Sequence, residues 1–331
     1  WKKQILYIVV GSMSLVGVTL LDYHLYARFA RHFYIANLIL LLIVLKFAPN
    51  INGAARWINL AGFKFQPSEF AKVLVILALA AFLTKHHETI RELKTFLLSL
   101  LYILPPMALI FKQNDLGTAL VVLAIWFGMV FMAGVRVRHL VGLIVIGSLL
   151  FTGLWMSGKV IKDYQKQRIT TWLRSIFDPE ADKGKAGYHV YQARTAIGSG
   201  QFFGKGWLQG TMVHGGYIPE RQTDFIYTTV GEEFGFIGCC VVLTLYAGIL
   251  FRGIVIVASS DEDLYGKLIG SGVLAMFAFH VLINIGMNVG ILPVTGVPLP
   301  LISAGGSNVI VTLTSIGLLE SVSIHRHQLL F

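Results

Sequence analysis

The chain has 331 residues, of which 55% are hydrophobic and 13% are charged, and its formal net charge is +10. Soluble domains carry about 25% charged residues, so this composition excludes an ordinary soluble protein and indicates a membrane protein. The positive charge suits anionic lipid headgroups or an anionic substrate, or it is the usual positive charge of cytoplasmic loops. No soluble basic domain is visible, so we expect no nucleic-acid partner.

Several apolar segments approach the roughly 20 residues that a helix needs to cross a bilayer. We therefore predict an all-α fold, a polytopic membrane helical bundle with nine transmembrane helices, and we treat residues 1–331 as a single domain. The predicted spans are 4–21, 33–48, 68–84, 95–111, 116–134, 139–157, 225–251, 267–291 and 306–323.

The predicted orientation follows from the Lys and Arg residues of the short loops, which mark the cytoplasmic side. The outer side then holds residues 49–67, 112–115, 158–224 and 292–305. An odd number of spans places Trp1 outside, in a sequence without a signal-peptide pattern. One further helix upstream of Trp1 would account for this start and would make ten.

Residues 158–224 form a large extracytoplasmic loop with ten Lys and Arg against six Asp and Glu. Within it, residues 163–177 place apolar and basic side chains on opposite faces, which predicts a short amphipathic helix on the membrane face or packed on the bundle. Residues 187–200 predict a second short helix closed by glycine. The glycine-rich stretch 198–210 matches no nucleotide-binding motif, and we interpret it as a tight turn that brings backbone N–H groups close to phosphates.

Asp224 ends this loop, directly before an apolar run that starts at Phe225. A carboxylate at the point where a polar loop enters the membrane can be solvated and still face a low-dielectric cavity, which suits acid–base chemistry. The alternative is that Thr223 or Asp224 only caps the helix. Spacing alone does not separate these two interpretations.

Two further outer stretches carry charge at the mouth of a span. Pro67 fits the first turn of a helix in which Glu69 and Lys72 lie at i,i+3 on one face, either as functional groups or as a local ion pair. Asp115 lies at the start of a later span, where the alternative is again a helix cap.

A third outer stretch, residues 291–308, packs several prolines and glycines into one connection. Irregular backbone at membrane depth is tolerated only where it is buried in protein or lines a watery cavity. The span before this connection holds His280, Asn284 and Asn288, which we interpret as helix–helix contacts. Charged candidates thus gather on the predicted outer face, which predicts a site on that side.

Five stretches of the chain resemble the SEDS family of polytopic membrane proteins (shape, elongation, division and sporulation). They are GAARWINLAGFKFQPSEFAK, NDLGTAL, AIGSGQFFGKGWLQGT, IPERQTDFIYTTVGEEFGFIG and GILPVTGVPLPLISAGGSN. DYQKQR followed by DPEADKGKAGYHVYQA is more similar to the elongation branch, RodA, than to the division branch, FtsW. The family has ten helices, with its large loop between the seventh and the eighth, so this chain fits a member that lacks the first helix. It departs from the family at Gln222, usually His, and at Asn114, commonly Pro.

The resemblance implies a peptidoglycan glycosyltransferase that polymerises lipid II into β-1,4 glycan strands. It would act at the outer face of the bacterial cytoplasmic (inner) membrane during elongation. The implied partners are a class B penicillin-binding transpeptidase and other membrane proteins of the elongation complex. Asp224 matches the family's essential Asp, and the matches to its other sensitive positions are Arg56, Glu69, Lys72 and Asp115.

Our hypothesis makes Asp224 the general base that takes the proton of the acceptor 4-hydroxyl. The leaving pyrophosphate would be stabilised by cations: Arg56, Lys72 and Arg221, with Arg194 and Lys205 as further candidates. Glu69 would hold Lys72 in place. No cofactor is certain, and a divalent cation, Mg²⁺ or Mn²⁺, is an open alternative for the same charge. The competing functions are a flippase for lipid-linked precursor, an FtsW-type division polymerase and a non-catalytic scaffold.

Overall fold

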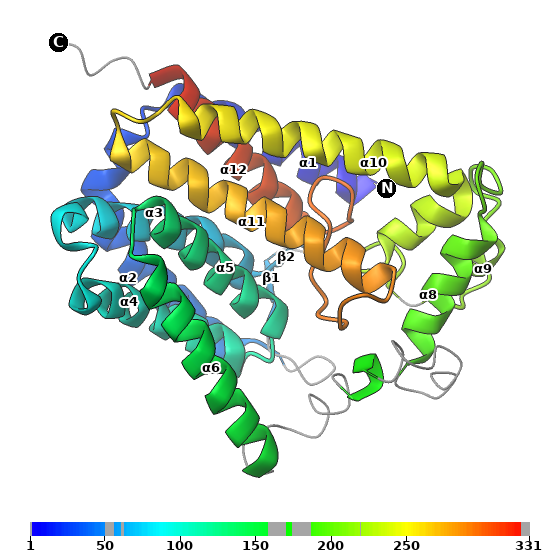
Figure 1. Cartoon of the computed structure of the whole chain (residues 1–331). Helices are drawn as coiled ribbons and strands as arrows, with labels where there is room; N and C mark the ends of the chain where they lie inside the picture. Colours follow the sequence, from blue (N-terminus) through cyan, green and yellow to red (C-terminus); the bar gives the residue numbers. More distant parts are fainter. Residues whose placement is uncertain are drawn as a thin grey trace. The chain divides into compact units, whose positions relative to one another are not determined.

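The computed structural model describes residues 2–49, 56–60, 63–157, 170–173, 187–218 and 220–325. This part of the chain is largely helical (Figure 1), which confirms the predicted all-α fold. A helix lies at each predicted span: α1 (Lys2–Leu20), α2 (His24–Phe47), α3 (Pro67–Lys85), α4 (Leu93–Lys112), α5 (Leu116–Met132), α6 (Val137–Ser157), α10 (Ile226–Ala258), α11 (Leu264–Asn288) and α12 (Gly306–His325). Of the described helices, seven are long and apolar enough to cross a membrane, while α5 and the part Val137–Leu150 of α6 are shorter apolar segments. The number of spans therefore stays a prediction.

Two helices extend well beyond the predicted apolar limits. α2 begins at His24 rather than at residue 33, and α10 continues to Ala258 rather than to residue 251. The extra turns carry Arg28 and Arg31 in α2 and Arg252 in α10. A prediction from hydropathy ends a span where such charged residues begin. The helix itself can continue beyond that point into the polar headgroup region, so the predicted limits were too short.

Contacts within the chain divide it into two compact units. Unit 1 consists of Trp1–Arg136, Ile249–Phe279 and Ala304–Phe331, and unit 2 consists of Val137–Gly248 and His280–Ser303. The chain therefore passes between the units within α10 and within α11.

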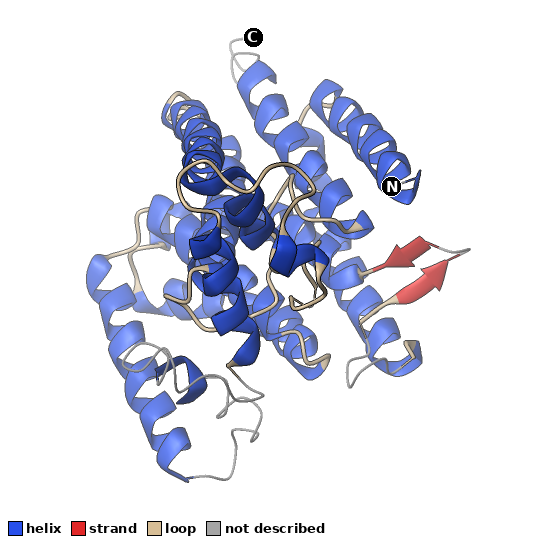
Figure 2. Ribbon diagram, turned by 90° about the vertical axis from the view of Figure 1, so that its right-hand side faces the viewer, coloured by secondary structure: helices blue, strands red, loops and turns tan. Residues whose placement is uncertain are grey.

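In unit 1, glycines allow helices to approach closely. α1 lies along α12 (Figure 2, the helices next to the N and C marks), where a Cβ on Gly317 would be 2.7 Å from the carbonyl oxygen of Leu15. Gly272 of α11 is similar, since a Cβ there would lie 2.8 Å from Met129 of α5 and 3.1 Å from Ile76 of α3. Larger residues at these positions would push the helices apart.

A short hairpin of unit 1 was not predicted. β1 (Ile58–Leu60) pairs antiparallel with β2 (Phe63–Phe65), directly before α3, and Figure 2 shows the pair in red. Strands of three residues are too short to show the alternation that identifies a strand in sequence. Ser307 of α12 anchors the hairpin, because its hydroxyl donates to Lys64 O at 3.3 Å and accepts from Gln66 N–H at 3.0 Å.

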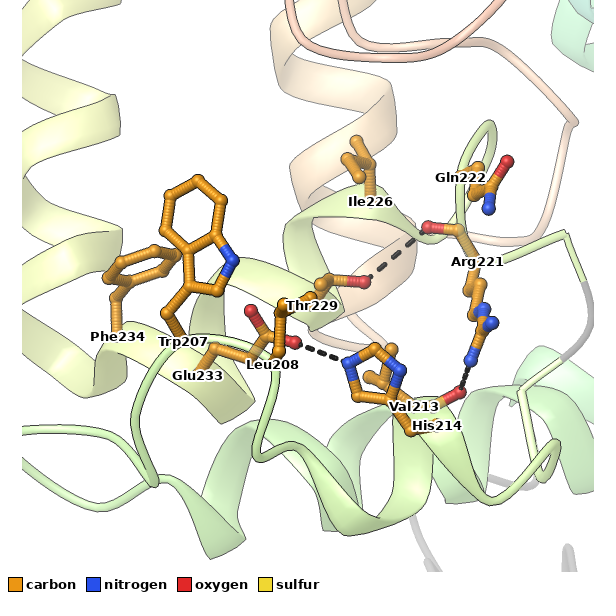
Figure 3. Close-up of a pocket in the computed structure, with 10 residues that line it drawn as sticks. All are labelled: Trp207, Leu208, Val213, His214, Arg221, Gln222, Ile226, Thr229, Glu233 and Phe234. Atoms are coloured by element: carbon orange, nitrogen blue, oxygen red, sulfur yellow. Dashed lines mark hydrogen bonds and ion pairs between the residues drawn. The ribbon is translucent and has the colours of Figure 1, made fainter. Parts of the chain in front are cut away.

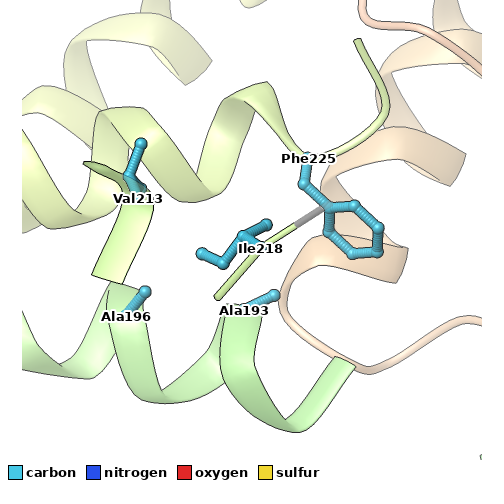
Figure 4. Packing of buried hydrophobic residues seen from close by; sticks show 5 residues of the cluster. All are labelled: Ala193, Ala196, Val213, Ile218 and Phe225. Carbon is cyan, nitrogen blue, oxygen red and sulfur yellow. The ribbon is translucent and has the colours of Figure 1, made fainter. Parts of the chain in front are cut away.

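Unit 2 contains two short helices of the large loop, α8 (Tyr188–Ser199) and α9 (Thr211–His214). α8 confirms the short helix predicted at 187–200. Its buried face joins α9 and the start of α10 in a small apolar cluster (Figure 4) that consists of Ala193, Ala196, Val213, Ile218 and Phe225. This cluster fixes the end of the loop against the beginning of α10.

Of the amphipathic helix predicted at 163–177, residues 170–173 are helical, and the rest lies outside the described residues. The indole N–H of Trp172 donates to the carbonyl oxygen of Ile291 at 2.9 Å. This bond connects the helical turn to the proline- and glycine-rich connection after α11.

α10 is broken at Gly235, whose φ of +66° is the left-handed conformation that glycine tolerates. The predicted span contained no such break. Residues 201–206 satisfy the interrupted backbone through four bonds: Lys205 N to Glu232 O, Gly206 N to Glu233 O, Phe236 N to Gln201 O and Ile237 N to Phe202 O, at 2.9–3.2 Å. The hypothesis that this glycine-rich turn offers its N–H groups to phosphates is therefore wrong for Lys205 and Gly206, whose N–H groups bind carbonyls of α10.

Candidate functional site

The predicted site residues are divided between the two units. Unit 1 holds Arg56, Glu69, Lys72 and Asp115, and unit 2 holds Arg194, Lys205, Arg221 and Asp224.

Glu69 and Lys72 form a buried ion pair in the first turns of α3. Pro67 opens this helix, and the i,i+3 spacing brings Lys72 Nζ to 2.8 Å from Glu69 Oε2. The exposed fractions are 1% for Lys72 and 4% for Glu69. Because a buried charge is costly without a partner, the ion pair with Glu69 holds Lys72 in place, as the sequence predicted.

Asp115 is the N-cap of α5, as the capping alternative required. Its Oδ1 accepts from the N–H of Thr118 at 3.3 Å. Its Oδ2 accepts from Gln66 Nε2 and from the Ser68 hydroxyl, each at 3.1 Å. These bonds connect the start of α5 to the start of α3 and leave the residue 4% exposed.

Arg56 lies against the turn that precedes Asp115. Its guanidinium donates to the carbonyl oxygens of Gln113, at 3.4 Å, and of Asn114, and its Nη1 lies 3.8 Å from Asp115 Oδ1. Asn114 has a φ of +59°, a conformation in which Asn is tolerated. Arg56 therefore supports this turn, and 26% of its side chain stays exposed.

In unit 2, Lys205 is paired with Glu232, a residue that the sequence analysis did not single out. Lys205 Nζ lies 2.7 Å from Glu232 Oε1 and 2.8 Å from the Thr211 hydroxyl. The buried Glu232 carboxylate also accepts from the N–H groups of Met212 at 2.9 Å and Val213 at 2.8 Å. An acidic residue inside an apolar span was the signal available in the sequence.

Arg221 borders a pocket of about 200 Å³ (Figure 3). Trp207 and Phe234 form an apolar wall, and His214 lines the pocket with its Nε2 2.9 Å from Glu233 Oε1. The guanidinium of Arg221 donates to the carbonyl of Val213. The pocket thus combines an apolar surface with a cation from the predicted site.

Arg194 lies on α8, and its side chain passes next to Gly290, just after the end of α11. Gly290 has a φ of +80°, and a Cβ there would lie 2.7 Å from Arg194 Cδ. The missing side chain therefore makes room for the stem of Arg194, which is half-buried.

Asp224 lies directly before α10 and is half-buried. Its backbone carbonyl accepts from the side-chain amides of Asn284 at 3.0 Å and Asn288 at 2.9 Å. Its carboxylate lies against the connection after α11, because a Cβ on Gly296 would be 3.3 Å from Asp224 Oδ2.

His280 contacts the same connection, since its Nδ1 lies 2.9 Å from the carbonyl oxygen of Pro298. The interpretation of the polar side chains of α11 as helix–helix contacts is confirmed for Asn288, whose Oδ1 accepts from the N–H and the hydroxyl of Thr228 in α10. It is corrected for His280 and Asn284, which bind backbone carbonyls before α10 and in the connection after α11. Among the described residues, no group of three or more His, Cys, Asp and Glu side chains is placed to hold a metal ion.

Comparisons with known proteins agree over almost the whole chain. The family model FTSW_RODA_SPOVE, described as "Cell cycle protein", matches residues 1–328. The peptidoglycan glycosyltransferase MrdB of Escherichia coli K12 is 37% identical over 328 residues, which cover 99% of this chain and 86% of MrdB. The peptidoglycan glycosyltransferase RodA of Treponema pallidum is 34% identical over 395 residues, covering 98% of this chain and 90% of RodA.

A solved structure is similar in fold as well as in sequence. It is described as "Structural coordination of polymerization and crosslinking by a peptidoglycan synthase complex". Its TM-score is 0.84 at 34% identity, and the match covers 99% of this chain and 90% of that chain.

Proposed function

From the premise that this chain belongs to the FtsW, RodA and SpoVE family and is a peptidoglycan glycosyltransferase of a bacterial membrane, we propose that Asp224 is its general base. The observation that carries this proposal is the half-buried carboxylate of Asp224, which lies at the end of a polar loop on a backbone fixed by buried amides. A carboxylate so placed has access to a hydroxyl group and little freedom to move away from it.

The proposed step is a single displacement on lipid II. The 4-hydroxyl oxygen of the acceptor sugar attacks the anomeric carbon of the donor, and its proton passes to a carboxylate oxygen of Asp224. The bond from the anomeric carbon to the pyrophosphate oxygen breaks, and the pyrophosphate leaves with the electron pair. Attack opposite the leaving group inverts an α-linkage, which gives a β-1,4 glycan strand without a covalent enzyme intermediate.

Cations stabilise the negative charge that grows on the leaving pyrophosphate. In unit 2, Arg221 fits this role best, because it borders a pocket. Lys205, by contrast, already lies against a buried carboxylate. Four further cations are also proposed to bind the pyrophosphate: Arg194 and Lys205 in unit 2, and Arg56 and Lys72 in unit 1. In unit 1, the carboxylates of Asp115 and Glu69 hold Arg56 and Lys72, respectively.

A divalent cation, Mg²⁺ or Mn²⁺, is a second proposed source of positive charge. The part of the chain that the structure describes contains no three-ligand set for it, so it would take most of its ligands from phosphates and water. Chelation by EDTA followed by Mg²⁺ or Mn²⁺ addition tests this point.

We place the site on the outer face of the inner membrane, where the predicted orientation puts residue 224. The proposed partner is a class B penicillin-binding transpeptidase, together with other membrane proteins of the elongation complex. This is supported by similarity to a structure whose description couples polymerization with crosslinking. The relatives named MrdB and RodA do not favour the division-type alternative.

The test is polymerisation of lipid II by the purified protein with its transpeptidase, for wild type, Asp224→Asn and Asp224→Ala. We expect both variants to lose glycan strands while folding and partner binding are kept. Glu220→Gln is the matched control, because Glu220 is an exposed carboxylate in the same loop. If the Asp224 variants polymerise at wild-type rates, Asp224 is not the base.

The same preparations separate the rival functions. Transport of fluorescent lipid II across vesicles without polymerisation would indicate a flippase. If this chain were only a scaffold, glycan strands would form equally well with Asp or with Asn at position 224.

A further inference from the structure

Two asparagines one helical turn apart on α11, Asn284 and Asn288, are fully buried. Both donate a side-chain N–H to the backbone carbonyl oxygen of Asp224, at 3.0 Å and 2.9 Å respectively. A carbonyl oxygen has two lone pairs, so the two amides together satisfy this acceptor. Burying an amide costs free energy unless it is hydrogen-bonded, and here both amides are used on the residue that carries the proposed base.

Asn288 completes the first turn of α10. Thr228 lies in the first turn of α10, where an N–H has no carbonyl four residues earlier within the helix, and its N–H donates to Phe225 O at 3.2 Å. The Asn288 amide adds a link from Thr228 to Asp224, because its nitrogen donates to Asp224 O and its Oδ1 accepts from Thr228 N–H at 3.1 Å. The Thr228 hydroxyl also donates to this Oδ1, at 2.7 Å. A side chain from α11 thus holds Asp224 just outside α10, which begins at Ile226.

Asn284 connects the backbone of Asp224 to the connection that its carboxylate faces. The same Nδ2 that binds Asp224 O also donates to the carbonyl of Val297 at 2.8 Å. The preceding residue is Gly296, which lies beside the Asp224 carboxylate. The amide of Asn284 therefore fixes both the backbone of Asp224 and the backbone of the connection that lies beside its carboxylate.

Ser303 adds a third attachment one residue earlier in the loop. Its hydroxyl donates to the carbonyl of Thr223 at 2.6 Å and accepts from the N–H of Leu299 at 2.8 Å. Consecutive peptides at residues 223 and 224 are thus held from elements that lie 60 to 80 residues further along the chain.

We propose that Asn284 and Asn288 are positioning residues for the carboxylate of Asp224, an inference that rests on the proposed function of Asp224 as the base. They act through the Asp224 peptide, which they hold where the carboxylate meets the acceptor hydroxyl. A base must lie within hydrogen-bond reach of its proton, and a displacement of about 1 Å can lower a rate by about 100-fold.

The test measures kcat and KM for lipid II polymerisation by the purified protein with its transpeptidase, for Asn284→Ala and Asn288→Ala. We expect kcat per folded protein to fall about 10- to 100-fold while KM changes less than about threefold. Ser271→Ala is the matched control, since Ser271 is also buried on α11 but donates to Lys267 O and Leu268 O of its own helix. Its kcat should equal that of wild type.

A second variant keeps the experiment informative if an alanine variant does not fold. Asn288→Gln retains the amide but moves it by one methylene, so we expect folded protein with a reduced kcat. In addition, we expect the double variant Asn288→Ala/Asp224→Asn to have the same residual polymerisation rate as Asp224→Asn alone. A double variant whose loss is the product of the two single losses would contradict action through Asp224.

The outcomes separate the two proposals. If Asp224→Asn polymerises at the wild-type rate, the role of Asp224 as base fails, and the positioning role fails with it. If Asp224→Asn is inactive while folded Asn284→Ala and Asn288→Ala keep the wild-type kcat, the base stands and the positioning role is overturned.

Discussion

The ammonium of Lys205 lies 2.7 Å from the carboxylate of Glu232, whose side chain is fully buried in the first part of α10. This pair connects the glycine-rich turn of the large loop to the helix that follows Asp224. The carboxylate also holds the N-terminal turn of α9 through the N–H groups of Met212 and Val213. The loop is therefore attached to α10 by charge as well as by backbone bonds.

Replacing Glu232 should destabilise this attachment. In Glu232→Gln the charge partner of Lys205 disappears, and one of two oxygens that accept backbone N–H groups becomes a donor. We expect a loss of about 2–4 kcal/mol, reduced from the fully buried case because 27% of the Lys205 side chain is exposed. Thermal unfolding in detergent measures this loss. Glu262→Gln is the control, since Glu262 is exposed, and equal melting temperatures for both variants would contradict the prediction.

Alanine substitutions at two glycines of the loop distinguish two contributions to the loss of stability: an unfavourable backbone conformation and a steric clash. Gly204 and Gly216 have similar φ values, +82° and +78°. A Cβ at Gly204 would lie 2.2 Å from the carbonyl oxygen of Glu233, whereas one at Gly216 has open space. Gly216→Ala should therefore cost about 1–2 kcal/mol, the cost of a left-handed alanine. Gly204→Ala should cost clearly more or prevent folding, as judged by thermal unfolding and size-exclusion profiles.

Asp115 should tolerate the loss of its charge better than the loss of its oxygens. Asp115→Asn keeps one oxygen as the acceptor for the cap. Its amide nitrogen replaces the oxygen that accepts from Gln66 and Ser68, and the part-exposed ion pair with Arg56 is weakened, so we expect a cost of about 1–2 kcal/mol. Asp115→Ala removes the cap acceptor as well, and about 2–3 kcal/mol is expected. Asp261→Asn, at a side chain with 73% exposure, is the control.

The same Asp115 variants bear on the mechanism. If Asp115 rather than Asp224 were the base, folded Asp115→Asn would lose polymerisation. We expect it to polymerise lipid II at a substantial fraction of the wild-type rate, measured per folded protein.

The turn between α1 and α2 should lose stability in acid. Burial alone would raise the pKa of Asp22, but hydrogen bonds from the backbone N–H and the ring of His24 outweigh it and hold the pKa below its ordinary value. A carboxyl whose pKa is lower in the folded state stabilises the fold above its unfolded pKa of about 3.9 and loses this contribution as the pH falls through the folded value.

Thermal unfolding of wild type and Asp22→Asn between about pH 3 and pH 7 measures this effect. The wild type should be the more stable of the two near neutral pH, and the difference should shrink below about pH 4. A difference that is the same at every pH would show that the charge of Asp22 contributes nothing.

Local sequence determined the helices and the short-range pairs of this protein. The lengths of the apolar runs placed a helix at every predicted span, because a segment must be apolar over about 20 residues to cross a bilayer. The ion pair of Glu69 with Lys72 and the cap at Asp115 were also readable, since both partners lie within one helical turn. Family motifs then identified the enzyme class.

Only the tertiary structure decided which groups surround the candidate base and how α10 is broken. Asn284 donates a hydrogen bond to Asp224, which is 60 residues away in the sequence, and Glu232 accepts one from Val213, which is 19 residues away. Gly235 can break α10 inside an apolar segment because a loop that precedes the helix supplies the missing hydrogen bonds. Such partners depend on which elements pack together, and periodicity within one element contains no information about that packing. A buried amide or carboxylate in sequence therefore shows only that a partner is needed, and the fold supplies the partner.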